Sequence, residues 1–226
     1  MNISNMGGAI EHWLGFQDKI GRSFMMNEDA LKYPLADYLV NDGNIDVGTI
    51  RLEHQHPNFS SRQVDLAIID STTTQINNIF ELKLAKRTTR DTSEKHRIFD
   101  DLMRLYLASL ETTSKCYFII AGKAIDFQSN FRGFEATEDN FYKKNIFYKK
   151  WFAFNSKVAQ TITFDVLTEI DQDYQAIYQG FLTEYPKDKY QGKTPLQLPN
   201  QITTTCEFVT ADSNQIPYMA GIWSIS

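Results

Sequence analysis

Two short apolar runs separated by a turn carry the charges that most constrain this fold. Residues 64–69 read Val-Asp-Leu-Ala-Ile-Ile and residues 79–85 read Ile-Phe-Glu-Leu-Lys-Leu-Ala, so each run is apolar except for Asp65 in the first and Glu81 and Lys83 in the second. Apolar runs of this length, bounded by Ser, Thr and Asn, are typical of strands covered on both faces of a sheet. Three charged side chains therefore stand where burying a charge is costly, and they need a reason.

Alternation along a strand places these charges relative to one another. Glu81 and Lys83 are two residues apart, so they share one face of their strand, and the apolar residues beside them take the other face. If the two runs are neighbouring strands, Asp65 stands near Glu81. Two carboxylates this close repel each other, and burial raises the cost unless a cation lies between them. A hard divalent cation such as Mg²⁺, with Mn²⁺ as a substitute, fits because it takes oxygen ligands and keeps positions for water and phosphate.

Asp65, followed by Glu81-Leu82-Lys83 on the next strand, resembles the PD-(D/E)XK motif of the restriction-endonuclease-like nucleases. The position before the aspartate is Val64, where the family name has proline. The resemblance implies a metal-dependent endonuclease that hydrolyses phosphodiester bonds, of DNA rather than RNA. It assigns both acids and the Leu82 carbonyl to Mg²⁺. It assigns Lys83 to the attacking hydroxide and to the charge of the transition state.

The resemblance covers roughly residues 27–121 and also implies a third acid, since many of these nucleases add a carboxylate from the first core helix. Glu28 stands at the start of a helical pattern and shares its apolar stripe, so it is the expected third catalytic and metal-binding residue. Glu11 and Glu53 stay open as alternatives. An acid at a helix start also has a simpler role, a favourable interaction with the helix dipole.

Hydropathy patterns predict an α/β fold with the order helix, three strands, helix and strand, at residues 28–40, 45–53, 64–69, 79–85, 92–110 and 116–121. A further amphipathic helix is expected at residues 10–20. This order is that of the family's core, so the resemblance implies a restriction-endonuclease-like fold: a central mixed sheet of four to five strands flanked by helices. The residues after it are expected to form a C-terminal β-rich extension that includes a hairpin of residues 203–209 and 218–225. We expect a single domain, 1–226, divided into a nuclease-like core (27–122), an aromatic and basic insertion (123–157) and an acidic extension (158–226).

Basic residues near the motif are candidates for contacts with nucleic-acid phosphates. Four of them follow the second charged run or belong to the helix 92–110: Lys86, Arg87, Lys95 and Arg104. The charged residues of that helix, Asp101 included, otherwise look like a solvated face. Residues 141–152 repeat Phe-Tyr-Lys-Lys, a pattern that suits a groove following a nucleic-acid backbone and equally suits a helix or strand with buried aromatics. The repeat adds Lys143, Lys144, Lys149 and Lys150.

Composition limits the function classes. A net charge of −5, with the acidic excess in residues 158–226, argues against a protein that coats nucleic acid non-specifically. No apolar run approaches the roughly 18 residues of a membrane span, and the first residues lack the pattern of a signal peptide. Two cysteines make no disulfide framework, which favours a cytoplasmic location. His54 and His56 are expected to be ordinary surface or turn residues.

Two other functions stay open beside the nuclease. The first is a non-catalytic nuclease-fold module that binds nucleic acid or a protein partner, in which Lys83 merely pairs with a carboxylate. The second is an unrelated hydrolase with Asp65 or Asp70 as nucleophile, for which the chain offers no supporting motif. Metal binding that depends on Asp65 and Glu81 separates the first alternative from the nuclease. A homodimer is one expected assembly of a nuclease, because cutting both strands of a duplex needs two sites.

Overall fold

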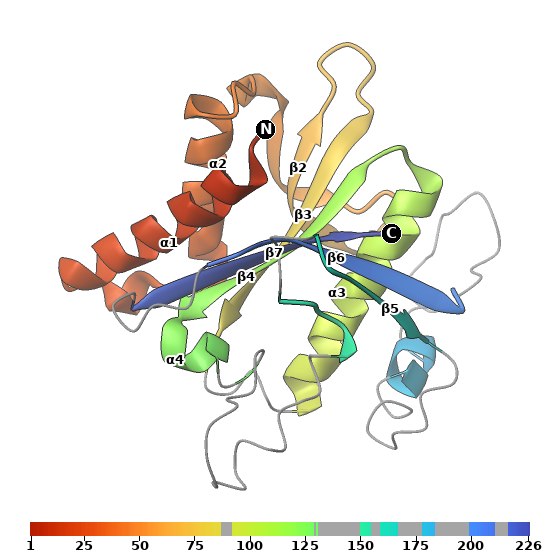
Figure 1. Cartoon of the computed structure of the whole chain (residues 1–226). Helices are drawn as coiled ribbons and strands as arrows, with labels where there is room; N and C mark the ends of the chain where they lie inside the picture. The colour runs from red at the N-terminus through yellow and green to blue at the C-terminus, as the bar shows by residue number, and fades with distance from the viewer. Residues whose placement is uncertain are drawn as a thin grey trace, which may run out of the picture.

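Figure 1 shows a computed structural model of the chain, which describes residues 1–86, 92–128, 130, 150–154, 159–166, 178–183, 199–210 and 217–226. Its centre is a seven-stranded sheet with the strand order β1-β2-β3-β4-β7-β6-β5. The strands are β1 (Ile50–Gln55), β2 (Gln63–Ile69), β3 (Ile76–Ala85), β4 (Lys115–Lys123), β5 (Thr161–Asp165), β6 (Gln201–Val209) and β7 (Tyr218–Ile225). The β3–β4 pair is parallel and the other described pairs are antiparallel, so the sheet is mixed.

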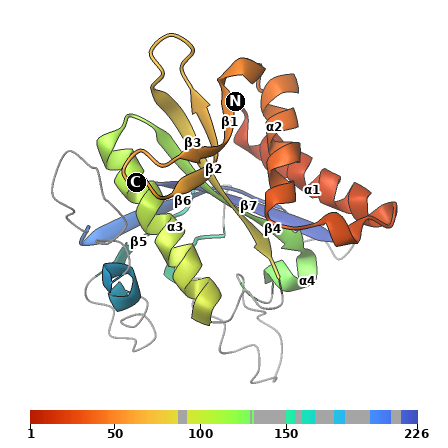
Figure 2. The ribbon, with the colours of Figure 1, turned by 180° about the vertical axis from the view of Figure 1, so that it is seen from behind.

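Helices cover both faces of this sheet (Figures 1 and 2). One face carries α1 (Ile3–Lys19) and α2 (Lys32–Asn41), and the other carries α3 (Thr92–Glu111). The short helix α4 (Ala124–Phe127) follows β4, and three 3₁₀ turns are Ser23–Met25, Asp29–Leu31 and Val47–Thr49. The result is a three-layer α/β arrangement with one apolar core on each side of the sheet. Among the described residues, no helix has the length and apolarity that a membrane span requires.

The alternation expected for the second charged run is confirmed in β3. Phe80 and Leu82 pack into the core under α1 and α2, whereas Ile79 and Ala85 pack into the core under α3. The two charged residues of the run lie on the α3 side with the latter pair, because side chains of a strand alternate with a period of two. A buried strand thus delivers an acid and a lysine into the interface between the sheet and α3.

The predicted α/β order of helix, three strands, helix and strand is confirmed, but the expected size of the sheet is wrong. Seven strands replace the predicted four to five, because the C-terminal strands join the central sheet. Strand β7 pairs with β4 along its whole length, from Tyr218↔Lys123 to Ile225↔Cys116. The predicted hairpin of residues 203–209 and 218–225 is confirmed as the antiparallel pair β6–β7. The extension is therefore β-rich as expected, yet its strands continue the sheet.

Element boundaries differ from the predictions where short polar residues form caps. Helix α1 begins at Ile3, well before residue 10, because the Asn2 side chain accepts hydrogen bonds from the first backbone N–H groups. Strand β1 begins at Ile50, not at residue 45, because Asp46 caps a 3₁₀ turn through the Gly48 N–H at 2.9 Å. Helix α2 begins at Lys32, not at residue 28, because the 3₁₀ turn Asp29–Leu31 precedes it, and the Asn27 Oδ1 accepts the Ala30 N–H of that turn at 2.8 Å.

Candidate active site

Strands β2 and β3 diverge at the position of the charged residues. Their pairing runs from Ile69↔Ile76 to Leu66↔Phe80 and stops there, although β2 continues on β1 and β3 continues on β4. The Asp65 side chain enters the gap, and its Oδ2 accepts the Leu82 N–H at 2.7 Å. The Asp65 carboxylate thus takes the place of a backbone carbonyl of β2 as the acceptor for an N–H of β3. The N–H and C=O of one strand residue point to the same edge, so the Leu82 carbonyl also faces this gap.

Glu81 lies beside Asp65 and is 5% exposed. Burial raises the pKa of the Glu81 carboxyl to about 8, against the lowering effect of Arg104 and Lys83 and with Asp65 adding to the rise. Its Oε1 is buried, and no described residue hydrogen-bonds it. Glu81 is therefore mostly protonated at neutral pH, and a cation that arrives beside it must displace that proton.

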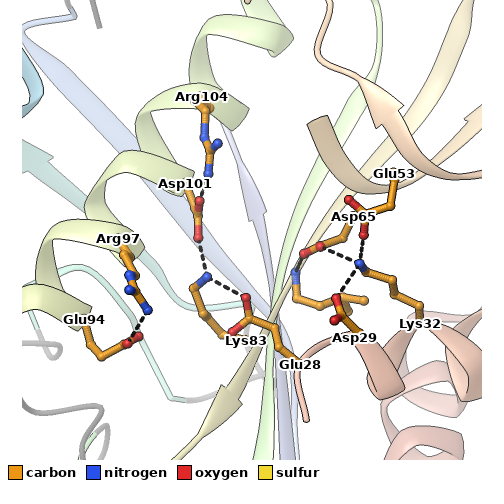
Figure 3. Close-up of polar contacts among 11 residues, drawn as sticks. Glu28, Asp29, Lys32, Glu53, Asp65, Lys83, Glu94, Arg97, Asp101 and Arg104 are labelled. Atoms are coloured by element: carbon orange, nitrogen blue, oxygen red, sulfur yellow. Dashed lines mark hydrogen bonds and ion pairs between the residues drawn. The ribbon is translucent and has the colours of Figure 1, made fainter. Parts of the chain in front are cut away.

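Lys83 is held between two carboxylates that come from opposite sides of the gap (Figure 3). Its Nζ lies 2.9 Å from Glu28 Oε1 and 2.9 Å from Asp101 Oδ2. Asp101, on α3, is 3% exposed, and its other oxygen pairs with Arg104. Glu28 accepts a hydrogen bond from the ammonium and Asp101 forms an ion pair with it, and because an ammonium has three N–H groups, Lys83 keeps donor capacity for a further ligand.

Lys32, the first residue of α2, forms a second network on the other side of Asp65 (Figure 3). Its Nζ lies 2.9 Å from Asp29 Oδ1 and 3.3 Å from Asp65 Oδ1, and it also pairs with Glu53. Glu53 has a φ of 49° although it lies in a strand, a left-handed conformation that costs a residue with a Cβ roughly 1–2 kcal/mol. The surrounding structure thus holds Glu53 toward this network despite the strain.

Negative charge exceeds positive charge in the two networks together. Three cations, Lys32, Lys83 and Arg104, are shared among six acids: Glu28, Asp29, Glu53, Asp65, Glu81 and Asp101. Like charges repel strongly where solvent screens them poorly, as at Asp65, Glu81 and Asp101, and less at Asp29 and Glu53, whose side chains are 80% and 51% exposed. The protonation of Glu81 relieves part of this excess, and a bound cation is the other way to relieve it.

The residues in the gap offer a hard cation few but suitable ligands. In the part of the chain that the structure describes, no group of three or more His, Cys, Asp or Glu side chains is placed to hold a metal ion. What the gap provides is two acids, Asp65 and Glu81, and the carbonyl of Leu82. The excess negative charge and the unpartnered Glu81 oxygen fit Mg²⁺, which takes oxygen ligands and keeps several waters. The residues present therefore fit a partly hydrated divalent ion.

The structure brings the predicted motif residues together and sorts the alternatives for the third acid. Glu28 and Glu53 both reach the networks, through Lys83 and Lys32 respectively. Glu11 does not, because it lies on α1 and accepts a hydrogen bond from Thr210 at 2.9 Å, beyond the end of β6. Asp70 caps its own turn through the N–H groups of residues 72 and 73, as expected of a turn residue.

The candidate nucleic-acid contacts are only partly placed. Lys86 is exposed directly after β3, Lys95 is half-buried on α3, and Lys150 is half-buried. Four of the predicted contacts lie outside the described residues: Arg87, Lys143, Lys144 and Lys149. The interpretation of Arg104 and Asp101 as a solvated face is wrong, because the pair points toward Lys83 and only 12% of the Arg104 side chain is exposed.

The expectation for His56 as a surface residue is also wrong. The side chain is 2% exposed, and its Nδ1 accepts the Asn58 N–H at 3.0 Å while its Nε2 lies 3.2 Å from the Arg104 carbonyl. Since Nδ1 accepts, Nε2 carries the proton and donates. Burial lowers the pKa of His56 to about 3, so the ring stays neutral and fastens the segment after β1 to α3. His54 is half-buried.

Three residues of the networks were missed from sequence: Asp29, Lys32 and Asp101. Of these, Lys32 and Asp101 lie on the apolar stripe of their helices, since Lys32 is three residues before Leu35 and Asp101 is three residues after Ile98. A charge within such a stripe is the signal that identifies them, since apolar positions recur at three and four residues.

Comparison with known proteins adds nothing to this geometry. No protein-family model, no curated protein and no solved structure matches the chain. The interpretation of the site therefore rests on its residues and their contacts.

Proposed function

We propose that the protein is a metal-dependent nuclease with a restriction-endonuclease-like core, and that it hydrolyses phosphodiester bonds, with DNA as the expected substrate. The observation that carries the proposal is the meeting of Asp65 and Glu81 in the gap between β2 and β3, with Lys83 on the same face of the same strand. Keeping two acids and a lysine in the interior of a sheet is costly, and a catalytic role accounts for the cost.

Asp65, Glu81 and the Leu82 carbonyl are the groups that would hold Mg²⁺ or Mn²⁺, with Glu28 as a ligand directly or through water. A divalent ion bound there lowers the pKa of a water molecule toward neutrality and screens the charge of the phosphate. Glu28 now contacts Lys83 and not Asp65, so its place in the site is beside the lysine.

The chain's own residues supply the remaining steps. Asp65 is fixed by the Leu82 N–H, and this contact sets the position of the acid relative to β3. Lys83 directs an N–H that Glu28 does not take toward a phosphate oxygen or the attacking water and stabilises the negative charge that builds up on the phosphate. Asp101 and Glu28 hold the ammonium in place for this task.

Several features of the substrate and assembly stay proposals. DNA is preferred on the strength of the resemblance alone, because none of these residues senses a 2′-hydroxyl. Lys86 and Lys95 are proposed phosphate contacts, together with Arg87 and the lysines of residues 143–150. A homodimer would place two such sites on a duplex.

The test combines metal binding with cleavage. Mg²⁺ and Mn²⁺ are titrated into the parent protein, Asp65→Asn and the matched control Asp37→Asn, which makes the same change at an exposed position of α2. Plasmid nicking is followed on the same samples. We expect the parent and the control to bind metal and nick, and Asp65→Asn to lose both while keeping its thermal unfolding temperature. Nicking by Asp65→Asn at the parent rate would show that the site is elsewhere.

One observation favours the alternative of a non-catalytic module. Lys32 and Lys83 already pair with the surrounding acids, so the networks hold together as ion pairs. A module of this kind would bind nucleic acid or a protein equally well with asparagine at position 65. This alternative would be favoured if the parent protein and Asp65→Asn both bound nucleic acid or a protein partner without metal and neither nicked the plasmid.

A further inference from the structure

Lys32 brings one ammonium group against three acids from three separate elements (Figure 3). Asp29 comes from the 3₁₀ turn before α2, Glu53 from β1 and Asp65 from β2. Only 6% of the Lys32 side chain is exposed, which is unusual for a lysine unless it is paired. The Lys32 ammonium is therefore a structural part of the site, although Lys32 is not a residue of the sequence motif.

The contact with Asp65 uses the oxygen that the backbone leaves available. Asp65 Oδ2 accepts the Leu82 N–H at 2.7 Å, and Oδ1 faces Lys32 Nζ at 3.3 Å. The Asp65 contact is longer than the 2.9 Å contact with Asp29. The ammonium is therefore anchored by its other partners and touches Asp65 more loosely.

A divalent ion at Asp65 and the Lys32 ammonium oppose each other. Both seek the same carboxylate, and two cations a few Å apart repel strongly where solvent screening is weak. The ammonium can leave Asp65 and stay paired, because Asp29 and Glu53 still hold it. The two cations are thus alternative partners of one acid.

We propose that Lys32 is an internal counter-ion that holds Asp65 when no divalent ion is bound, and that it sets the metal affinity of the site by competing for that acid. The inference rests on the proposed function, since it takes Asp65 as a metal ligand. Lys32 acts through Asp65 and is a positioning residue. Its presence keeps the acids of the gap ordered without metal and makes the site weaker for Mg²⁺ than the acids alone would be.

The experiment is calorimetric titration of Mg²⁺ into the parent protein, Lys32→Met and two controls. Lys83→Met removes a lysine from the same gap whose ammonium contacts Glu28 and Asp101. Lys115→Met removes an exposed lysine at the far end of β4. We expect Lys32→Met to bind Mg²⁺ about tenfold more tightly than the parent, because a unit charge is removed from the carboxylate that the ion takes. The gain should be smaller in Lys83→Met and absent in Lys115→Met.

Thermal unfolding with and without Mg²⁺ gives a second readout, in which the rise on adding Mg²⁺ is the part that a purely structural lysine would not produce. Without metal, Lys32→Met should unfold at a lower temperature than the parent, because three acids lose their counter-ion. In saturating Mg²⁺ its unfolding temperature should rise by more than that of the parent, because tighter binding stabilises the folded state further. If the methionine variant does not fold, Lys32→Gln is measured in the same way.

The outcomes separate this inference from the proposed function. Binding of Mg²⁺ by Lys32→Met alone, with none by the parent, would also support competition. If the parent binds Mg²⁺ and Lys32→Met binds it equally or more weakly, the inference is overturned and the nuclease proposal stands. An equal gain in Mg²⁺ affinity in Lys83→Met would overturn the inference too. The affinity would then depend on the number of positive charges near the site, and contact of a lysine with Asp65 would not matter. No binding by either protein would overturn both.

Discussion

Glu81→Gln replaces the buried carboxyl group by an amide that has nearly the same shape and does not titrate. Burial raises the pKa of Glu81 from 4.5 to about 8 in the folded, metal-free protein. An acid with a raised pKa binds more protons when folded than when unfolded, so its contribution to stability is fully present below pH 4.5 and is lost as the pH rises through 8. The folded state thus becomes less stable across the neutral range on account of this residue.

The size of the effect follows from the width of that window. Each unit of pKa difference corresponds to about 1.4 kcal/mol, so between pH 5 and pH 8.5 the Glu81 carboxyl should lower the free energy of unfolding by roughly 4 kcal/mol. Glutamine does not titrate, and the variant should lack this part of the pH dependence. His56, whose pKa is lowered to about 3, changes stability in the opposite direction, but it does so equally in both proteins and cancels in the comparison.

The assay is urea unfolding of the parent and Glu81→Gln at several pH values between 5 and 8.5, in the presence of a chelator. Asp37→Asn, at an exposed position, is the control for loss of an acid at the surface. We expect the two curves of stability against pH to lie close together near pH 5, where the folded parent carries a neutral carboxyl as the amide does, and to diverge as the pH rises toward 8.5, with the parent becoming the less stable protein. Parallel curves would refute the reasoning, because they would show that Glu81 has the same affinity for protons in the folded and unfolded chain.

Three further substitutions test the packing of the site and of α1. Asp101→Ala leaves Lys83 and Arg104 short of a buried partner, so urea unfolding should show a loss of about 3 kcal/mol, whereas a loss within experimental error would mean that the network carries no stability. Gly7→Ala would place a Cβ 2.2 Å from a ring carbon of Phe208 and should lower the free energy of unfolding by about 1–3 kcal/mol. Gly8→Ala meets nothing within 4 Å and should raise it by about 0.5–1 kcal/mol, so equal effects at the two glycines would contradict the described contact between α1 and β6.

The charged residues of the gap show what local pattern determines. That Glu81 and Lys83 share one face of a buried strand follows from the period of two along an extended chain, and the structure confirms it. The hairpin of β6 and β7 was predictable for a similar reason, since both strands have the length and composition of strands and lie near each other in the chain. These features depend on residues that are close in sequence.

The tertiary structure decided which distant groups meet. Strand β7 joins β4 across about a hundred residues, so the size of the sheet depends on a pairing that no local pattern specifies. Lys32 and Asp101 lie on the apolar stripes of their helices, but only the packing of β1, β2 and β3 against those helices supplies the opposite charges with which they pair. Burial and charge pairing are properties of the packed molecule: the cost of burying an ion is offset only by partners that folding brings within a few Å.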